Sequence, residues 1–214
     1  MDRIQIFKKM EDSGIVAVIR LTNVDKMGKL IGALSKGGVK ALEITMTTPN
    51  ALNIIDKISD KLDDEFLIGA GTVLDSETAA QAIHADADFI VSPIFDKAMV
   101  ELTHRYDKVV VPGAFSPTEI KNAWDAGADA VKIFPASNLG PHYLKNIHGP
   151  LPQIKLTPTG GVNTENAAEY IKNGAVFLGA GSALVEKDKL RNNDWQGIQN
   201  RAREFVNIIK EARK

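Results

Sequence analysis

Eight short apolar segments recur along the chain at nearly even intervals, and an amphipathic stretch follows each of them. Their centres lie 20 to 26 residues apart, which is the length of one strand, one helix and two short loops. The segments are 15–19, 40–44, 66–70, 88–92, 108–112, 130–134, 154–158 and 175–179. Nearly continuous apolar strands that alternate with helices indicate a parallel sheet that helices cover.

The intervening stretches carry helix signals. In residues 24–36, four apolar side chains recur on one face, namely Met27, Leu30, Ile31 and Leu34. Residues 117–126 begin with a proline directly after Ser116, which is a typical helix start. Glycines that can end a helix in the left-handed conformation come before the next apolar segment at Gly37-Gly38, Gly127 and Gly174.

Eight strand–helix units in 214 residues predict a (β/α)8 TIM barrel. A doubly wound open sheet is the alternative architecture. We expect residues 2–13 to form an extra N-terminal helix that closes the bottom of the barrel, and residues 194–214 to form the eighth helix. No proline-rich linker or block of like charge interrupts the chain, so residues 1–214 are predicted to form a single domain.

Composition excludes several classes of function. The net charge is −1 and the pI is about 6.4, so no basic footprint for nucleic acid or for a membrane surface is expected. The absence of cysteine excludes disulfides, a thiolate nucleophile and cysteine-bound metal. Charges throughout residues 1–11 argue against a signal peptide, and no apolar run approaches the roughly 18 residues of a membrane helix. We therefore expect a soluble cytoplasmic protein.

Strand side chains alternate between two faces, so parity predicts which polar residues point into a barrel. In 40–44 and 130–134 the large aliphatic residues should face the helices, which leaves Glu43 and Lys132 facing inward. Arg20 follows the first segment with inward parity. Thr72 follows the third segment and shares the parity of Ile68 and Ala70, which we also expect to face inward. These polar residues would meet at the carboxyl ends of the strands, where barrel active sites lie.

Lys132 is the centre of the predicted chemistry. Apolar surroundings disfavour an ammonium, and a neutral amine can form a Schiff base with a carbonyl substrate. Glu43 is the predicted proton shuttle, Arg20 suits a substrate carboxylate, and Thr72 adds a donor for that carboxylate. The alternatives are a lysine that extends to water, or a structural ion pair between Glu43 and Lys132.

Two glycine-rich loops follow the seventh and eighth segments. They read Thr159-Gly160-Gly161-Val162 and Gly179-Ala180-Gly181-Ser182. Loops at these places commonly bind phosphate in barrels, because backbone N–H groups can approach the anion. Ordinary turn glycines are the alternative explanation. Neither loop has the third glycine of the dinucleotide fingerprint, and no two histidines have a metal-ligand spacing, so we predict neither a cofactor nor a metal.

These motifs together resemble the 2-keto-3-deoxy-6-phosphogluconate (KDPG) aldolase family, which includes the 4-hydroxy-2-oxoglutarate (KHG) aldolases. The resemblance extends from residue 15 to about residue 185 and rests on 15–20, 42–45, 69–73, 91–93, 131–135, 158–162 and 181–184. It implies a metal-independent class I aldolase on a (β/α)8 barrel, without a cofactor and typically a homotrimer. Lys132 would be the Schiff-base lysine and Glu43 the general acid and base. The implied substrate contacts are Arg20, Thr72, Pro93, Phe134, Thr159, Gly160, Gly161, Gly181 and Ser182.

The resemblance predicts cleavage of KDPG to pyruvate and glyceraldehyde 3-phosphate, as in the Entner–Doudoroff pathway, and cleavage of KHG to pyruvate and glyoxylate as a second activity. Some members carry an arginine where this chain has Thr47, which leaves the far end of the substrate less specified. The galactonate-type sibling aldolase is therefore an alternative. A phosphosugar isomerase or epimerase and a non-catalytic ligand-binding barrel are the alternatives from other classes.

Overall fold

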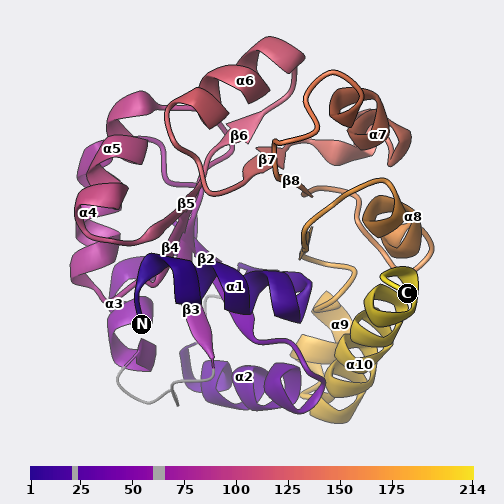
Figure 1. Ribbon diagram of the computed structural model, residues 1–214. Coiled ribbons are helices and arrows are strands. Elements are labelled where there is room, and N and C mark those ends of the chain that lie inside the picture. The colour runs from indigo at the N-terminus through magenta and orange to yellow at the C-terminus, as the bar shows by residue number, and fades with distance from the viewer. Residues whose placement is uncertain (21–23, 60–65) are drawn as a thin grey trace.

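The computed structural model describes residues 1–20, 24–59 and 66–214. Figure 1 shows a central ring of strands with helices around its outside, which confirms the predicted (β/α)8 barrel. The strands are β1 (Ile15–Ile19), β2 (Ala41–Thr45), β3 (Leu67–Gly71), β4 (Phe89–Val91), β5 (Val109–Val111), β6 (Gly113–Ala114), β7 (Val131–Ile133), β8 (Leu156–Pro158) and β9 (Leu178–Ala180). All eight predicted segments contain strand.

The strands follow one another around the ring in chain order. One sheet has the order β5-β4-β3-β2-β1-β9, the other has the order β6-β7-β8, and every pair is parallel. Pro112 separates β5 from β6, so the fifth predicted strand is interrupted and pairs with a different neighbour on each side. Single bridges from Leu156 to Ala175 and from Thr159 to Gly179 connect the remaining edges. This order is that of a barrel, and the doubly wound alternative is wrong.

The helices form the outer layer. They are α2 (Met27–Lys36), α3 (Ala51–Ser59), α4 (Ser76–His84), α5 (Lys97–Arg105), α6 (Pro117–Asp125), α7 (His142–His148), α8 (Ala167–Lys172), α9 (Lys187–Arg191) and α10 (Trp195–Ala212), with the short 3-10 helices η1 (Val24–Lys26) and η2 (Ala136–Asn138). A capping box between Ser116 and Glu119 starts α6, as the sequence predicts. Gly38, Gly127 and Gly174 have φ values of 94°, 101° and 99°, which confirms the left-handed turns.

Helix α1 (Arg3–Ser13) closes the end of the barrel where the strands begin. A capping box between Asp2 and Gln5 starts the helix, and Ile6, Phe7 and Met10 are its buried residues. The Phe7 ring packs edge-on against Phe177, which lies directly before β9. The predicted N-terminal closing helix is confirmed. No helix in the described residues has the length and apolar character needed to cross a membrane.

Two layers of apolar side chains show which strand residues face inward. The inner layer joins α1 to residues such as Val16, Ala41, Leu67 and Val111. The outer layer lies between strands and helices, and it includes neighbours of opposite parity such as Ile15, Leu42, Ile44, Val131 and Ile133. Glu43 and Lys132 therefore have inward parity, as predicted.

The third strand differs from the prediction. Ile68 and Ala70 belong to the outer layer, so their expected inward orientation is wrong. Gly69 and Gly71 take the inward positions instead, because larger neighbours fill the space beside them. A Cβ atom at Gly69 would overlap the Phe89 ring, and one at Gly71 would overlap the Glu43 carboxylate.

Candidate active site

Glu43 on β2 and Lys132 on β7 are two of the few charged residues that the barrel buries. Their exposed fractions are 2% and 4%. Both line a small interior cavity of about 10 Å³, together with Thr157 and Thr159, and that volume holds about one water molecule. The two side chains are therefore close enough to act on one small substrate.

The Glu43 carboxylate lies against the bare backbone of Gly71. Its Oε1 atom is buried and has no hydrogen-bond partner among the residues that the structure describes. A buried polar atom without a partner costs stability, so folded proteins keep few of them. This oxygen is free to bond a group that a ligand or a water molecule brings.

Lys132 contacts an aromatic ring instead of a carboxylate. Its Nζ atom lies 5.0 Å from the centroid of the Phe134 ring. Within the described residues no ion pair joins the ammonium to Glu43 or to any other carboxylate. The structural ion pair that the sequence left open is therefore not formed, and the amine is not committed to a structural bond.

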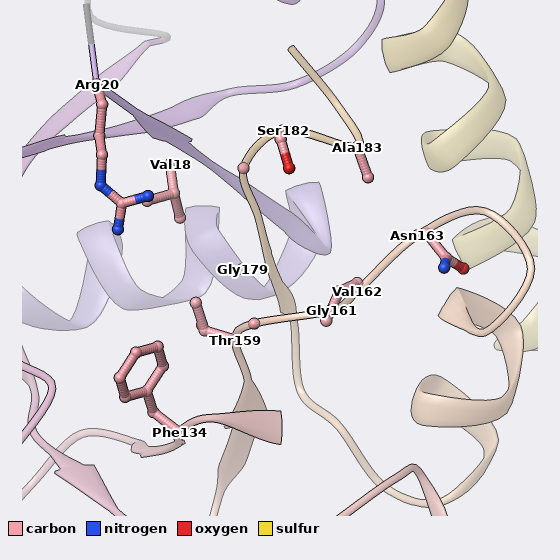
Figure 2. Close-up of a pocket in the computed structure, with 12 residues that line it drawn as sticks. Val18, Arg20, Phe134, Thr159, Gly161, Val162, Asn163, Gly179, Ser182 and Ala183 are labelled. Carbon is pink, nitrogen blue, oxygen red and sulfur yellow. The ribbon is translucent and has the colours of Figure 1, made fainter. Parts of the chain in front are cut away.

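A larger cavity of about 390 Å³ adjoins the small one (Figure 2). Thr159 and Gly179 line both cavities, and Phe134 connects them through its contact with Lys132. The larger cavity is lined by Val18, Arg20, Phe134, Thr159, Gly160, Gly161, Val162, Asn163, Gly179, Gly181, Ser182 and Ala183. The two cavities therefore share part of their walls, with Lys132 lining the smaller one and the glycine loops lining the larger one.

Arg20 is the only ionisable side chain among these twelve lining residues. It follows β1 directly, and its guanidinium lies on the same side of the cavity as the Phe134 ring (Figure 2). Among the described residues, no carboxylate lines the cavity to offset the guanidinium charge. The cavity is therefore suited to an anionic ligand.

Residues of both glycine loops line this cavity. Gly160 and Gly161 have φ values of 94° and 77°, a conformation that other residues rarely adopt. A Cβ atom at Gly161 would also lie 2.7 Å from the Cβ atom of Ser137. In the described part of the chain, the N–H groups of Gly160, Gly161, Gly181 and Ser182 donate no hydrogen bond. Glycine loops that line a cavity and whose N–H groups lack protein acceptors are typical of anion sites.

Thr72 and Pro93 line neither cavity. Thr72 directly follows β3, is half-buried and has a φ of 59°, which is a strained value for a β-branched residue. Pro93 is half-buried beside Gly113, where a Cβ atom would overlap the Pro93 backbone. The predicted contacts of these two residues with a substrate stay predictions.

Four further residues line the cavities, although the sequence did not identify them as site residues. They are Thr157, Val18, Asn163 and Ala183. Thr157 pairs with Lys132 in the β7–β8 register, and its hydroxyl donates to the Phe177 carbonyl at 2.9 Å. Its parity with Thr159 is a signal that could have identified it. In the described residues, no group of three histidine or carboxylate side chains could hold a metal ion.

Known proteins resemble this chain in sequence and in fold. The family described as "KDPG and KHG aldolase" matches residues 6–201. A 2-dehydro-3-deoxy-phosphogluconate aldolase of Haemophilus influenzae is 35% identical over 207 residues, which is 96% of this chain and 97% of the relative. A 2-dehydro-3-deoxy-6-phosphogalactonate aldolase of Escherichia coli strain K12 is 32% identical over 94% of this chain and 95% of the relative.

A solved structure of KDPG aldolase from Legionella pneumophila, with pyruvate captured as a covalent carbinolamine intermediate, has a TM-score of 0.85. It is 30% identical, and the match covers 92% of this chain and 96% of that one. The family match over most of the sequence and the shared fold lead to one conclusion. The chain belongs to the KDPG and KHG aldolase family.

Proposed function

We propose that this chain is a class I aldolase that cleaves KDPG to pyruvate and glyceraldehyde 3-phosphate through a Schiff base on Lys132. The observation that carries the proposal is one cavity lined by a buried lysine and by the buried Glu43, whose Oε1 atom has no hydrogen-bond partner in the described part of the chain. The names of the relatives support the substrate, and the carbinolamine of the Legionella enzyme supports covalent chemistry with pyruvate.

The chemistry begins when Lys132 passes a proton to the Glu43 carboxylate and its neutral amine attacks C2 of the 2-oxo acid. Glu43 donates a proton to the carbinolamine hydroxyl, water leaves, and a protonated imine remains. The C4 hydroxyl then gives its proton to the Glu43 carboxylate, directly or through one water. As the C3–C4 bond breaks, its electron pair moves toward the imine nitrogen, which yields an enamine and releases the aldehyde.

The remaining steps restore the enzyme. Glu43 returns a proton to C3 of the enamine, and the imine forms again on what is now the pyruvate skeleton. Water adds to C2, the C–N bond breaks, and pyruvate leaves Lys132 as the free amine. The lysine thus divides one difficult bond cleavage into easier steps.

The larger cavity would hold the rest of the substrate. Arg20 neutralises an anionic group, and the predicted assignment is the carboxylate of the pyruvate unit. Thr72 and Pro93 are kept as proposed substrate contacts outside the lining of this cavity. The phosphate lies on the free N–H groups around Gly161 and Ser182. Anchors at both ends of the substrate fix the position of the reacting carbons relative to Lys132.

The far end of the substrate decides between sibling activities. Thr47 is exposed and its hydroxyl lies 2.9 Å from that of Thr45, so this position offers hydroxyl groups and no charge. We assign KDPG as the main substrate, because relatives named for it match this chain, and KHG as a second substrate without phosphate. The galactonate-type epimer is the second candidate, since one relative carries that name.

Three finer assignments rest on family membership. We propose that the chain works in the cytoplasm, forms a homotrimer and acts in the Entner–Doudoroff pathway. Light scattering coupled to gel filtration tests the trimer directly. A monomer at micromolar concentration that is fully active would overturn it.

The reaction is tested by a panel of the three acids with coupled detection of released pyruvate. We expect kcat/KM to be highest for KDPG, lower for the galactonate-type epimer and lowest for KHG. Reduction with borohydride in the presence of pyruvate should add mass to the peptide that contains Lys132. An isomerase or a binding barrel would release no pyruvate and trap none.

A further inference from the structure

The proposed phosphate site is made by two loops that come from different strands. The first loop, 159–166, connects β8 to α8, and the second, 181–186, connects β9 to α9. At their bases a single bridge between Thr159 and Gly179 joins them. An anion that takes N–H groups from both loops needs them at a fixed separation, because small displacements weaken such contacts.

Arg201 of α10 reaches both loops with one guanidinium. Its Nη1 lies 3.4 Å from the Thr164 hydroxyl of the first loop, and Nε and Nη2 lie 3.3 and 3.2 Å from Oε1 of Glu186 in the second. Nη1 also donates to Glu204 on the same helix at 3.0 Å. The hydrogen bond from Lys189, assisted by Arg201, holds the pKa of Glu186 below its usual range, so this carboxylate stays charged.

Hydrogen bonds within each loop connect the part that Arg201 contacts to the glycines of the proposed anion site. In the first loop, Asn166 donates through its side chain to the Gly161 carbonyl at 2.9 Å. In the second loop, the N–H groups of Leu184 and Val185 donate to the Gly181 carbonyl at 3.0 and 2.9 Å. A shift of Thr164 or Glu186 is therefore passed on to Gly161 and Gly181.

Arg201 stands behind the wall of the phosphate cavity and not inside it. It lines a separate cavity of about 260 Å³, and Asn163 and Ala183 line both that cavity and the larger one. Two carboxylates, Glu186 and Glu204, balance its charge. Its influence on an anion is therefore exerted through the loops, since it does not touch the cavity and its own charge is offset.

We propose that Arg201 is a positioning residue for phosphate recognition, which holds the two glycine loops at the separation that the anion requires. The inference rests on the proposed function, because it assumes that a substrate phosphate binds between these loops. A planar guanidinium suits this role, since it bonds two partners in fixed directions whereas an ammonium cannot.

The test compares Arg201→Gln with the parent on KDPG and on KHG, which lacks a phosphate. We expect the KM for KDPG to rise on the order of tenfold, while kcat/KM for KHG and borohydride trapping of pyruvate stay within about twofold. Arg201→Lys should recover only part of the loss. Thr164→Val removes one contact without changing a charge, so it should raise the KM for KDPG in the same direction by a smaller factor.

Arg203→Gln is the matched control, because Arg203 is exposed on the same helix, and it should leave every parameter unchanged. A parent that releases no pyruvate from either acid overturns the proposed function and this inference with it. If the parent cleaves KDPG but Arg201→Gln leaves its KM unchanged, only the inference is overturned. Equal losses on both substrates would assign Arg201 to general stability and also overturn it.

Discussion

The two ends of the barrel each place a lysine over a phenylalanine ring. The lysine at one end has a carboxylate partner, and the lysine at the other end has none among the described residues. At the end closed by α1, the Nζ atom of Lys155 lies 4.2 Å from the centroid of the Phe7 ring and 3.1 Å from the Glu11 carboxylate, and the side chain is 41% exposed. At the open end, Lys132 is buried over Phe134 without an ion pair to a described residue.

Other polar groups follow the same division. At the closed end, Asp129 accepts from the Val110 N–H at 2.9 Å, and Asp88 accepts from the Ile68 N–H at 3.0 Å. At the open end, Oε1 of Glu43 and the N–H groups of Gly160, Gly161, Gly181 and Ser182 have no partner in the described residues. The closed end thus satisfies its polar groups and stabilises the fold, whereas the open end leaves them ready for a ligand.

The largest expected effect separates the two lysines. Lys132→Met should abolish borohydride trapping of pyruvate and aldol cleavage, because Lys132 carries the one amine among the described residues that line the cavity. Lys155→Met should keep trapping and turnover, and should lower the free energy of unfolding by under about 1 kcal/mol. Mass spectrometry of the reduced protein makes the comparison, and label that persists in Lys132→Met would refute the nucleophile assignment.

The two carboxylates should separate activity from stability. Glu43→Gln cannot carry protons, so turnover should fall by roughly 10²–10⁴, while the free energy of unfolding should change by less than about 1.5 kcal/mol because the amide has nearly the same size and shape. Asp129→Ala should lower the free energy of unfolding by about 1–3 kcal/mol and leave KM unchanged. Steady-state kinetics and urea unfolding measure both effects. Turnover of Glu43→Gln within a few-fold of the parent would remove Glu43 from the mechanism.

Two glycines with positive φ allow a matched comparison of intermediate size. A Cβ atom at Gly161 would lie 2.7 Å from the Cβ atom of Ser137, and one at Gly14 would lie 2.6 Å from Cγ2 of Ile209. Gly161→Ala should lower kcat/KM for KDPG by about tenfold and that for KHG much less, because the phosphate donors are displaced. Gly14→Ala should lower only stability, by about 1–2 kcal/mol. Equal losses on both substrates in Gly161→Ala would assign that glycine to the fold.

The smallest expected effect is the pH response of the closed end. Burial raises the pKa of Asp88, against the opposing effects of the Ile68 N–H, Lys108, Lys9 and the N-terminus. The folded state therefore holds this proton more tightly than the unfolded chain. The resulting stability is fully present below the usual pKa of 3.8 and is lost as the pH rises through the folded pKa.

Asp88→Asn stays neutral at every pH and keeps an oxygen for the Ile68 N–H. Its free energy of unfolding should therefore change less than that of the parent between pH 3.5 and pH 7, as urea titrations at both values would show. Pyruvate trapping at pH 7 should be unchanged. An identical pH response in the two proteins would show that the Asp88 carboxyl does not contribute.

Hydrophobic pattern predicted the barrel because strand–helix alternation and parity are local properties of a sequence. Glu43 and Lys132 point inward for the predicted reason, since their aliphatic neighbours pack against helices. The predicted orientation of the third strand was wrong because its inward positions are glycines. Nothing in the local sequence indicates that Phe89 and Glu43 occupy the space beside them. The break at Pro112 depends on a change of strand partner and is likewise not local.

The chemistry of the candidate site was less accessible to sequence reasoning. Glycine motifs predicted where an anion could lie, but the free N–H groups and the missing Glu43–Lys132 ion pair are three-dimensional facts. Thr157 could have been predicted from the sequence, because it shares parity with Thr159. The role of Arg201 could not have been predicted from the sequence, since it contacts Thr164 and Glu186 only because α10 packs beside both loops.

The carboxylate of Glu43 occupies the volume that a methyl group at position 71 would fill. The side chain at position 71 and the side chain at position 43 therefore compete for the same volume. The size of one limits the size of the other, although Gly71 contributes no functional group. An engineered library that varies either position alone will sample mostly collisions or voids. A Cβ atom at position 71 would also overlap Cγ of Glu43, an atom that aspartate keeps, so shortening the acid to Glu43→Asp does not make room for Gly71→Ala.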